Sequence, residues 1–282
     1  MKKTELICGI AAFILLIAGI AMALRVYFTY QKGRETYDDM EAAFTSDNPG
    51  EKSEDTESAT GDGTGSETDD MEKDSISETG SESLPEDAPE RITVDWGALS
   101  ASYDDCVAWI QIPAVEISYP VMQAEDNDYY LHRSPDGSYI YAGSIFMDYQ
   151  NDSYLEDFNT IIYGHNMRDG SMFAKLKQFK DSEVLVFCPY FWIYTPDRDY
   201  LYRIFSVHSV NADGNAYALE FDGYEGYTEW FYEMLDTSEI DTGITALVGK
   251  KAVTLSTCNG NSATRLVVQG VLVWQDVESE DD

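Results

Sequence analysis

An uncharged apolar stretch near the start of the chain most constrains how the protein can fold. Residues 6–24 read LICGIAAFILLIAGIAMAL and carry no charged side chain over 19 positions. At about 1.5 Å of helical rise per residue, this stretch nearly spans a hydrocarbon core of about 30 Å. A transmembrane helix is therefore expected here, and a folded domain must come from the rest of the chain.

A cleaved signal peptide is the alternative, because Lys2 and Lys3 form a basic start and Ala21-Met22-Ala23 resembles a small-residue cleavage site. The apolar run exceeds the usual signal core of about 7–15 residues, which favours an uncleaved anchor. Basic residues flank both ends, so the positive-inside count does not fix the orientation. The few residues before the helix and the acidic chain after it favour an outward-facing body. We expect residues 1–34 to be a single-pass N-terminal anchor with its flank, in the cell membrane, with the body extracellular.

Residues 35–90 are strongly acidic. They include 20 Asp and Glu residues against two lysines, Lys52 and Lys73, with many Ser, Thr and Gly. Such low apolar content cannot offset the entropy of backbone ordering, and like charges extend the chain. We expect this segment to be an acidic disordered spacer that holds the following body off the membrane.

The remaining body, residues 91–282, is long enough to bury a core as a single domain. It carries 31 acidic residues against 11 Lys and Arg. Nucleic-acid binding depends on clustered cations that neutralise phosphates, and the body contains no basic stripe. The sequence therefore predicts no nucleic-acid partner.

Short runs rich in β-branched and aromatic residues recur through the body. They lie at 109–113, 117–121, 144–147, 160–163, 184–188, 200–210, 252–257 and 265–274. Two other stretches, 172–179 and 227–235, have apolar side chains at helical spacing. The pattern predicts a mainly β domain with added helices. The sequence contains no glycine-rich phosphate loop and no clustered metal-ligand spacing, so we expect no cofactor and no metal.

Three cysteines lie in the body, an odd number that leaves at least one thiol unpaired. Cys106 and Cys188 each sit among apolar residues. A disulfide between them is possible in an oxidising compartment, but two inert buried thiols are the ordinary outcome and are favoured here.

Cys258 and His165 are the candidates for nucleophilic chemistry. Each follows a hydrophobic strand-like run and precedes a loop, which is a usual position for a nucleophile or its base. Read alone, each has an ordinary structural interpretation, as a buried apolar thiol and a hydrogen-bonded histidine. The other two histidines, His132 and His208, show no comparable arrangement with a second reactive group.

Arg265 begins the next apolar run, seven residues after Cys258. A hairpin-like connection would bring its guanidinium beside the thiol. There it could donate hydrogen bonds to an oxyanion that develops when a thiolate attacks a carbonyl. A surface ion pair is the alternative role in so acidic a domain.

The stretch Thr254-Leu-Ser-Thr-Cys258, followed by Arg265-Leu-Val-Val-Gln269, resembles the nucleophile motif and succeeding strand of sortases. Five further stretches are similar to class B sortases in the same order: Trp109-Ile-Gln-Ile-Pro113, Tyr119-Pro-Val121, Asp126-Asn-Asp-Tyr-Tyr-Leu131, Ala142-Gly-Ser-Ile-Phe-Met-Asp148 and Ile161-Ile-Tyr-Gly-His-Asn-Met167. The match covers about residues 91–275 and includes a helix-bearing insertion around 224–236 that is typical of class B.

The resemblance implies a closed eight-stranded sortase-type β-barrel with added helices and the class B helical insertion. In such a barrel, Cys258, His165 and Arg265 would meet at one end of a substrate groove as the catalytic residues. By their positions in matching motifs, four residues would line the groove or lie near the substrate: Asn127, Leu131, Ser256 and Tyr217. The six residues between Cys258 and Arg265 are fewer than in some class B members, so substrate preference could differ.

The resemblance also implies an activity. The chain would be a cysteine transpeptidase that cleaves a C-terminal sorting signal of secreted proteins after Thr. It would transfer the thioacyl intermediate to an amine of a peptidoglycan precursor or of another surface protein. Two alternatives remain at this point: a secreted cysteine peptidase using the same pair, and a non-enzymatic surface binding module suggested by the anchor, the acidic stalk and the 20 tyrosines.

Overall fold

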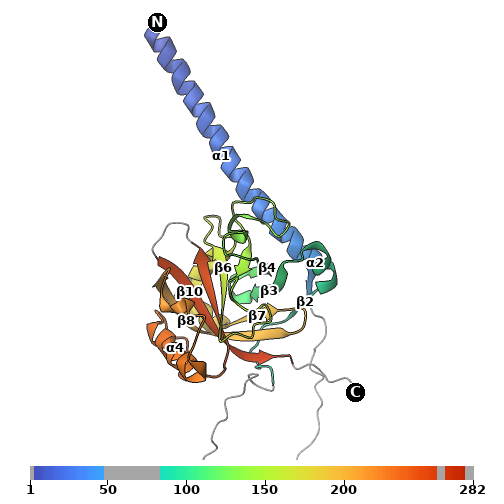
Figure 1. The fold of residues 1–282 in the computed structure, drawn as a ribbon. Helices are drawn as coiled ribbons and strands as arrows, with labels where there is room; N and C mark the ends of the chain where they lie inside the picture. Colours follow the sequence, from blue (N-terminus) through green and yellow to red (C-terminus); the bar gives the residue numbers. More distant parts are fainter. Residues whose placement is uncertain (1–2, 48–82, 259–263, 277–282) are drawn as a thin grey trace, which may run out of the picture.

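The computed structural model describes residues 3–47, 83–258 and 264–276. Eight strands form a closed barrel in the order β10-β8-β7-β3-β4-β5-β6-β9 (Figure 1). Their bounds are β3 (Cys106–Ile112), β4 (Ile117–Met122), β5 (Ile145–Met147), β6 (Asn159–His165), β7 (Tyr190–Tyr194), β8 (Asp199–Asn211), β9 (Ala252–Cys258) and β10 (Thr264–Gln275). The expected closed, mainly β barrel is confirmed.

The barrel closes through a mixture of pairings. β4 pairs with β5 and β6 pairs with β9 in parallel, whereas the other neighbouring strands are antiparallel. The register of β10 against β8 shifts between Gln269 and Gly270. A side chain on Gly270 would collide with the ring of Phe191 of β7, so only glycine lets that ring pack against β10 at this bulge.

Aromatic side chains make up much of the hydrophobic core on both faces of the barrel wall. Trp109, Phe191 and Trp192 are fully buried and belong to one hydrophobic cluster, with Phe191 and Trp192 on opposite faces of β7. Helix α4 (Gly223–Thr237) lies between β8 and β9 in the chain and packs Phe231 on Phe205 of β8, with ring centroids 4.4 Å apart. This helix is the predicted insertion, which is confirmed. The short elements are α2 (Trp96–Ser102), η1 (Pro113–Val115), η2 (Tyr130–His132), η3 (Phe173–Lys180) and η4 (Asn215–Tyr217).

One predicted strand is wrong. Residues 184–188 lie mostly in helix α3 (Ser182–Phe187), whose first turn is capped because the Asp181 carboxylate accepts a hydrogen bond from the Glu183 amide. The side chains of Val186 and Phe187 point into solvent, 85% and 80% exposed. Despite their high strand propensity, these two residues do not belong to a strand. The strand of this region is β7, which directly follows and is buried throughout.

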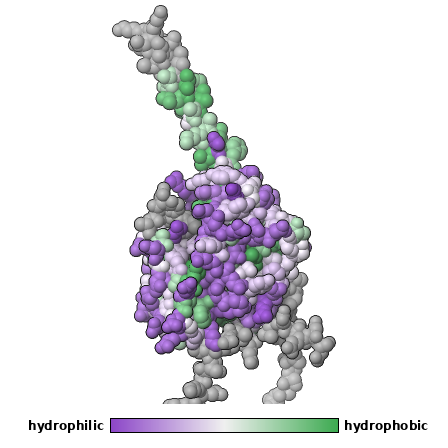
Figure 2. Space-filling model, in the orientation of Figure 1, coloured by the Kyte–Doolittle hydropathy of each residue, from purple (hydrophilic) through white to green (hydrophobic). Residues whose placement is uncertain are grey.

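Helix α1 (Lys3–Phe44) contains the predicted membrane span and continues well past it. Among the described residues it is the helix long and apolar enough to cross a membrane, with a mean hydropathy of 2.2 over its most apolar window. It projects from the barrel (Figure 1), and its projecting part is hydrophobic whereas the visible face of the barrel is mainly hydrophilic (Figure 2).

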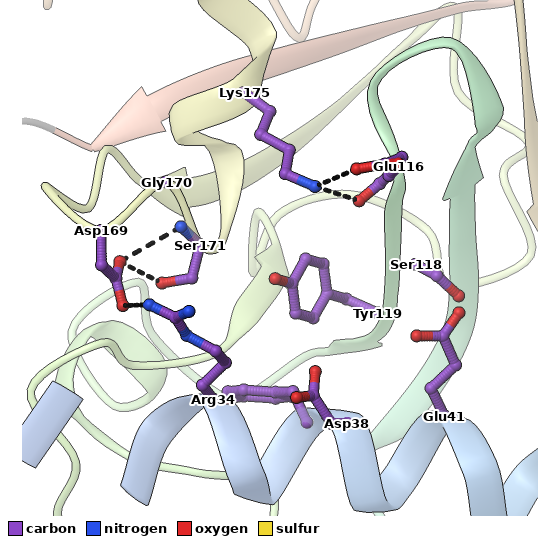
Figure 3. Close-up of a pocket in the computed structure, with 11 residues that line it drawn as sticks. Arg34, Asp38, Glu41, Glu116, Ser118, Tyr119, Asp169, Gly170, Ser171 and Lys175 are labelled. Atoms are coloured by element: carbon purple, nitrogen blue, oxygen red, sulfur yellow. Dashed lines mark hydrogen bonds and ion pairs between the residues drawn. The ribbon is translucent and has the colours of Figure 1, made fainter. Parts of the chain in front are cut away.

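The last turns of α1 pack directly on the barrel. Tyr37 and Met40 are both buried to 4% exposure. The Tyr37 hydroxyl donates to the Gly143 carbonyl at 2.6 Å, and its ring meets that of Tyr119 edge-on at 5.3 Å. Arg34 reaches from α1 to Asp169 at 3.2 Å, across a cavity of about 180 Å³ (Figure 3).

The chain then forms a small separate sheet. β1 (Thr45–Asp47) follows α1 and pairs antiparallel with β2 (Ile92–Val94), with Asp47 opposite Ile92. Residues 83–90 are also ordered on the barrel, where the Trp192 indole donates to the Pro89 carbonyl. The structure thus differs from the expected 35–90 spacer at both ends, because these ends have apolar and hydrogen-bonding partners on the barrel. The middle, 48–82, lies outside the described residues.

Candidate active site

The parallel pairing of β6 and β9 brings His165 and Cys258 together. The strands run in register from Asn159 opposite Ala252 to His165 opposite Cys258, the last residue of each strand. Neighbouring strands lie about 4.8 Å apart, so the two backbones are adjacent at this end of the barrel. The expectation that the two strand ends face each other is confirmed.

Strand β10 flanks β9 on its other side. Val267 pairs with Ser256, and the Thr257 hydroxyl both accepts from the Leu266 amide at 3.2 Å and lies 3.4 Å from the Leu266 carbonyl. The β9–β10 pairing ends at Val267 and Ser256, and Arg265 lies two residues before Val267 just as Cys258 lies two residues after Ser256. The Arg265 guanidinium donates to the Thr257 carbonyl at 3.4 Å, immediately before Cys258 in the chain.

The orientation of the His165 ring follows from its hydrogen bond. Nε2 lies 2.7 Å from the Leu131 carbonyl oxygen. Since a carbonyl oxygen can only accept, Nε2 carries a proton, and Nδ1 is the nitrogen whose protonation distinguishes imidazole from imidazolium. Leu131 thus reaches the site through its backbone, and its side chain is half-buried against the core.

Ser256 and Tyr217 form a second pair beside these strand ends. Ser256 is fully buried, and its hydroxyl lies 2.7 Å from the Tyr217 hydroxyl. Tyr217 comes from η4, the turn that follows β8. Its ring stacks on Tyr163 of β6 with centroids 6.3 Å apart and planes 18° apart.

Asp148 connects Asn127 to this group. Its Oδ2 accepts hydrogen bonds from the Tyr163 hydroxyl and from the Asn127 side-chain amide, each at 2.9 Å. The carboxyl group is buried at 3% exposure, and its Oδ1 accepts from the Gln150 amide at 3.0 Å. Asn127, Tyr217 and Ser256 therefore belong to one network along the barrel wall.

Sequence reasoning did not assign Asp148, Tyr163 or His132 to the site. Asp148 and Tyr163 stand within two of the motifs that carry the family resemblance, and this was the available signal. His132 was expected to have no arrangement with a reactive group, which is wrong. Its ring stacks on His165, with centroids 5.3 Å apart and planes 16° apart. Two residues in η2 thus contact His165, Leu131 by its carbonyl and His132 by its ring.

Cys106 and Cys188 are free and buried, which confirms the favoured interpretation of two buried thiols. Burial raises the pKa of Cys106 to about 12 and also raises the pKa of Cys188. Thiols that ionise so reluctantly are poor nucleophiles at neutral pH. His208 is also buried, and burial lowers its pKa.

Comparison with known proteins identifies the family. The Sortase domain model matches residues 110–273, which is more than half of the chain. Sortase B of Listeria monocytogenes is 38% identical over 172 residues, covering 60% of this chain and 70% of that protein. Sortase B of Staphylococcus aureus is 26% identical over 187 residues, covering 65% and 77%.

Solved structures agree. Sortase B from B. anthracis in complex with AAEK1 superposes with a TM-score of 0.66 at 28% identity, covering 88% of this chain and 99% of that one. Sortase B from Listeria monocytogenes gives a TM-score of 0.56 at 37% identity, covering 61% and 97%. With the closed barrel, the α4 insertion and the joined ends of β6 and β9, these matches show that the chain belongs to the sortase family, as a class B sortase and hence a cysteine transpeptidase.

Proposed function

We propose that this transpeptidase cleaves a C-terminal sorting signal after Thr, with Cys258 as nucleophile, His165 as acid and base, and Arg265 as stabiliser of the developing oxyanion. The observation that carries the proposal is the register of three adjacent strands. His165 lies opposite Cys258 on one side, and the β9–β10 pairing leads to Arg265 on the other. A histidine, a cysteine and an arginine on three adjacent strands are the groups that acyl transfer through a thiol requires: an acid–base group, a nucleophile and an oxyanion donor.

In the first half of the reaction, the Cys258 thiolate attacks the carbonyl carbon of the threonine. A C–S bond forms, and the carbonyl electrons move to oxygen. When the tetrahedral intermediate collapses, the C–N bond breaks and the imidazolium of His165 gives its Nδ1 proton to the leaving amine. An unperturbed thiol has a pKa of about 8.5, so this step requires a site that favours the thiolate at neutral pH.

In the second half, an acceptor amine attacks the thioester carbon. The C–S bond breaks, sulfur leaves as thiolate, and neutral His165 takes the proton lost by the amine. The product is a new amide bond, and both catalytic groups return to their starting protonation. We propose that the amine belongs to a peptidoglycan precursor or to another surface protein.

Arg265 is proposed to stabilise the oxyanion, and the polar network to bind and orient the sorting signal. A guanidinium that already donates to the Thr257 carbonyl is close to the backbone that precedes the nucleophile. Two parallel N–H donors of such a group suit an oxyanion or a substrate carbonyl. We propose that Asn127, Leu131, Ser256 and Tyr217 line the groove for the sorting signal, with Asp148 holding Asn127 and Tyr163 in place.

We also propose that α1 is retained as a single-pass anchor and that the barrel faces outward. The helix is longer than a signal core and its last turns are part of the folded body, since Tyr37 and Met40 are buried. An anchored enzyme meets membrane-retained substrates and wall precursors at one surface, which raises their effective concentration.

The test uses the full chain in detergent with a panel of fluorogenic sorting-signal peptides and an added amine, and it reads products by mass spectrometry. Wild type is compared with Cys258→Ala and with Cys106→Ala as a matched control, because Cys106 is a buried thiol in the same domain. We expect cleavage after Thr, an amine-ligated product and a trapped thioacyl adduct at Cys258. Cys106→Ala should retain them and Cys258→Ala should lose them.

Other outcomes separate the alternatives. Hydrolysis without an amine-ligated product, at every amine concentration, would favour a cysteine peptidase. Turnover that survives Cys258→Ala would refute the proposed nucleophile. His165→Asn and Arg265→Ala should each lower kcat/KM by about 10²-fold or more, in line with loss of an acid–base group or an oxyanion donor.

A further inference from the structure

The exit of α1 from the membrane is close to a loop of the barrel. The apolar stretch ends at Leu24 and is followed by Arg25, and the first ring contact with the barrel is Tyr30, whose centroid is 5.9 Å from that of Tyr141. Six residues of helix correspond to about 9 Å along its axis. The headgroup layer on each side of a bilayer is roughly 5–8 Å thick. Counted from Leu24, the contact with Tyr141 therefore lies at the outer edge of the headgroup layer, and the residues Tyr27 and Phe28 lie within it.

The loop at this level presents aromatic side chains to solvent. Tyr139 is 71% exposed and Tyr141 is 48% exposed, with Ile140 buried between them. The loop also touches α1 one turn further on, where a Cβ added to Gly33 would lie 3.6 Å from both Ile140 and Ala142. This second contact fixes the height of the loop relative to the helix.

The helix adds two exposed rings just below this loop, Tyr27 and Phe28. Tyrosine is enriched at membrane–water interfaces, because its ring prefers the apolar side and its hydroxyl the headgroups. Two cations lie near this loop: Lys32 acts electrostatically on Asp136, and the Arg133 guanidinium lies 4.7 Å from the centroid of the Tyr129 ring. The aromatic residues of loop and helix thus form one interfacial surface.

Resting on the proposed anchoring of α1, we infer that the Tyr139–Tyr141 loop lies against the headgroup surface of the membrane. The partner of this surface is the lipid interface itself. Tyr141 stacks on His132 at 6.1 Å, and His132 in turn stacks on His165. Only the ring of His132 therefore separates His165 from Tyr141, the residue that faces the lipid. The barrel would therefore work at the membrane surface and not at the end of a long tether.

The test is a spin-label depth measurement on the full chain in bilayers of phosphatidylethanolamine and phosphatidylglycerol. The background is Cys8→Ser with Cys258→Ala, since Cys106 and Cys188 are buried. The label is attached at Tyr139→Cys. The matched control is Tyr154→Cys, which is similarly exposed at 63%. Tyr154 is remote, because its carbonyl accepts from Tyr200, which pairs with Gln275 at the far end of β10.

Power saturation with oxygen and a water-soluble nickel chelate gives the result. We expect the label at position 139 to be at least about three-fold less accessible to the nickel chelate than the label at position 154, and more accessible to oxygen, as for an interfacial side chain. Equal accessibility of the two labels to the nickel chelate would overturn the inference. Intact mass of the reconstituted chain verifies that α1 is present.

A different observation, the imidazole stack, carries a second inference that rests on the proposed function. His165 is held on one edge by the Leu131 carbonyl, and the ring of His132 covers one of its faces at 5.3 Å. His132 is itself held between rings, with Tyr141 nearly parallel at 20° and its Nδ1 3.3 Å from the Tyr141 carbonyl oxygen. We infer that His132 is a positioning residue that fixes the plane of the catalytic imidazole.

The test separates the flat ring of His132 from its ring nitrogens. His132→Ala removes the stack, whereas His132→Phe keeps a flat ring that cannot titrate. We expect His132→Ala to lower kcat about five-fold with KM changed by less than about two-fold, because only the geometry of the acid–base group is disturbed. His132→Phe should recover at least about half of wild-type kcat with an unchanged pH profile.

Either of two results would overturn this second inference: wild-type kcat for His132→Ala, or equal losses for the Ala and Phe variants at unchanged melting temperature. His165→Asn is measured in parallel. An active His165→Asn would refute the proposed function itself, whereas an inactive His165→Asn with fully active His132→Ala would refute only the role of His132.

Discussion

Gly164 precedes His165, the proposed acid–base residue, in β6, and its substitution tests the site geometry most sharply. Its backbone lies outside the left-handed region, so an alanine would add volume without backbone strain. The added Cβ would lie 2.5 Å from Ile145 Cδ1 and 2.6 Å from the Phe173 ring, and both of these side chains are fully buried. Gly164→Ala therefore wedges β6 against β5 and η3.

The magnitude follows from these distances. Carbon atoms pack at about 3.5–4.0 Å, so the surrounding atoms must give by about 1 Å. Overpacking of this kind costs about 1–3 kcal/mol, which lowers the melting temperature by about 2–10 °C in a domain of this size. Because a 1 Å misplacement of a catalytic group can cost about 10²-fold, and part of the shift is absorbed by side chains, kcat/KM should fall about 10-fold or more.

Thermal unfolding and amine-dependent cleavage measure the two effects. Ile145→Val removes the nearest atom, so the double variant should regain part of the stability and activity lost in Gly164→Ala. Gly226→Ala is the control, because a Cβ at Gly226 meets its nearest neighbour at an ordinary 3.5 Å. Wild-type melting temperature and kcat/KM for Gly164→Ala would refute the reasoning, since they would show that the wall beside His165 moves freely.

Three further predictions concern stability, the groove and thiol reactivity. Burial and the neighbouring Asp276 raise the pKa of Asp199 to about 6. The ionised Asp199 carboxylate therefore destabilises the native state. As the pH falls from above about 6 toward about 3.9, the pKa of Asp in the unfolded chain, the native state gains stability. Asp199→Asn should thus be more stable than wild type by about 1–2 kcal/mol at about pH 7.5 and by about half as much at about pH 5. Urea unfolding measures the free energy of unfolding at both pH values. A stability difference between variant and wild type that does not depend on pH would contradict the assignment. Tyr217→Phe removes the hydroxyl that lies 2.7 Å from the buried Ser256 hydroxyl. This change should cost about 1 kcal/mol of stability and raise KM. Unchanged kinetics would show that Tyr217 does not line the groove. With a pKa of about 12, Cys106 should resist iodoacetamide at about pH 8 in the native chain and react in urea, as read by peptide mass mapping; native labelling would show that it is accessible and ionised.

The main elements of the barrel could be predicted because strand periodicity and turn residues are local signals. The long runs at 200–210 and 265–274 fall within β8 and β10. The run at 184–188 shows the limit of this reasoning, since Val186 and Phe187 have strand propensity but an Asp181 cap begins a helix. The parallel pairing of β6 with β9 is not local, because closure of the barrel decides it; only the family resemblance indicated that His165 and Cys258 meet.

The docking of α1 was missed because composition was averaged over a long acidic segment. Tyr37, Met40 and Phe44 have helical spacing within residues 35–44, and Tyr37 and Met40 are in the core. This amphipathic signal was available in the sequence. The series of ring contacts from Tyr30 to His165 was not available, because its members come from three separate parts of the chain.

The pairing of β1 with β2 makes the acidic segment a permissive insertion site. Its ends are joined at Asp47 and Ile92, so the number of residues between them does not set the distance from helix to barrel. Doubling the number of residues between two joined ends adds only about 0.6 kcal/mol of loop-closure free energy. Evolution or an engineer can therefore lengthen, shorten or replace residues 48–82, for instance with an epitope or a reporter domain, and leave the position of the barrel relative to α1 unchanged.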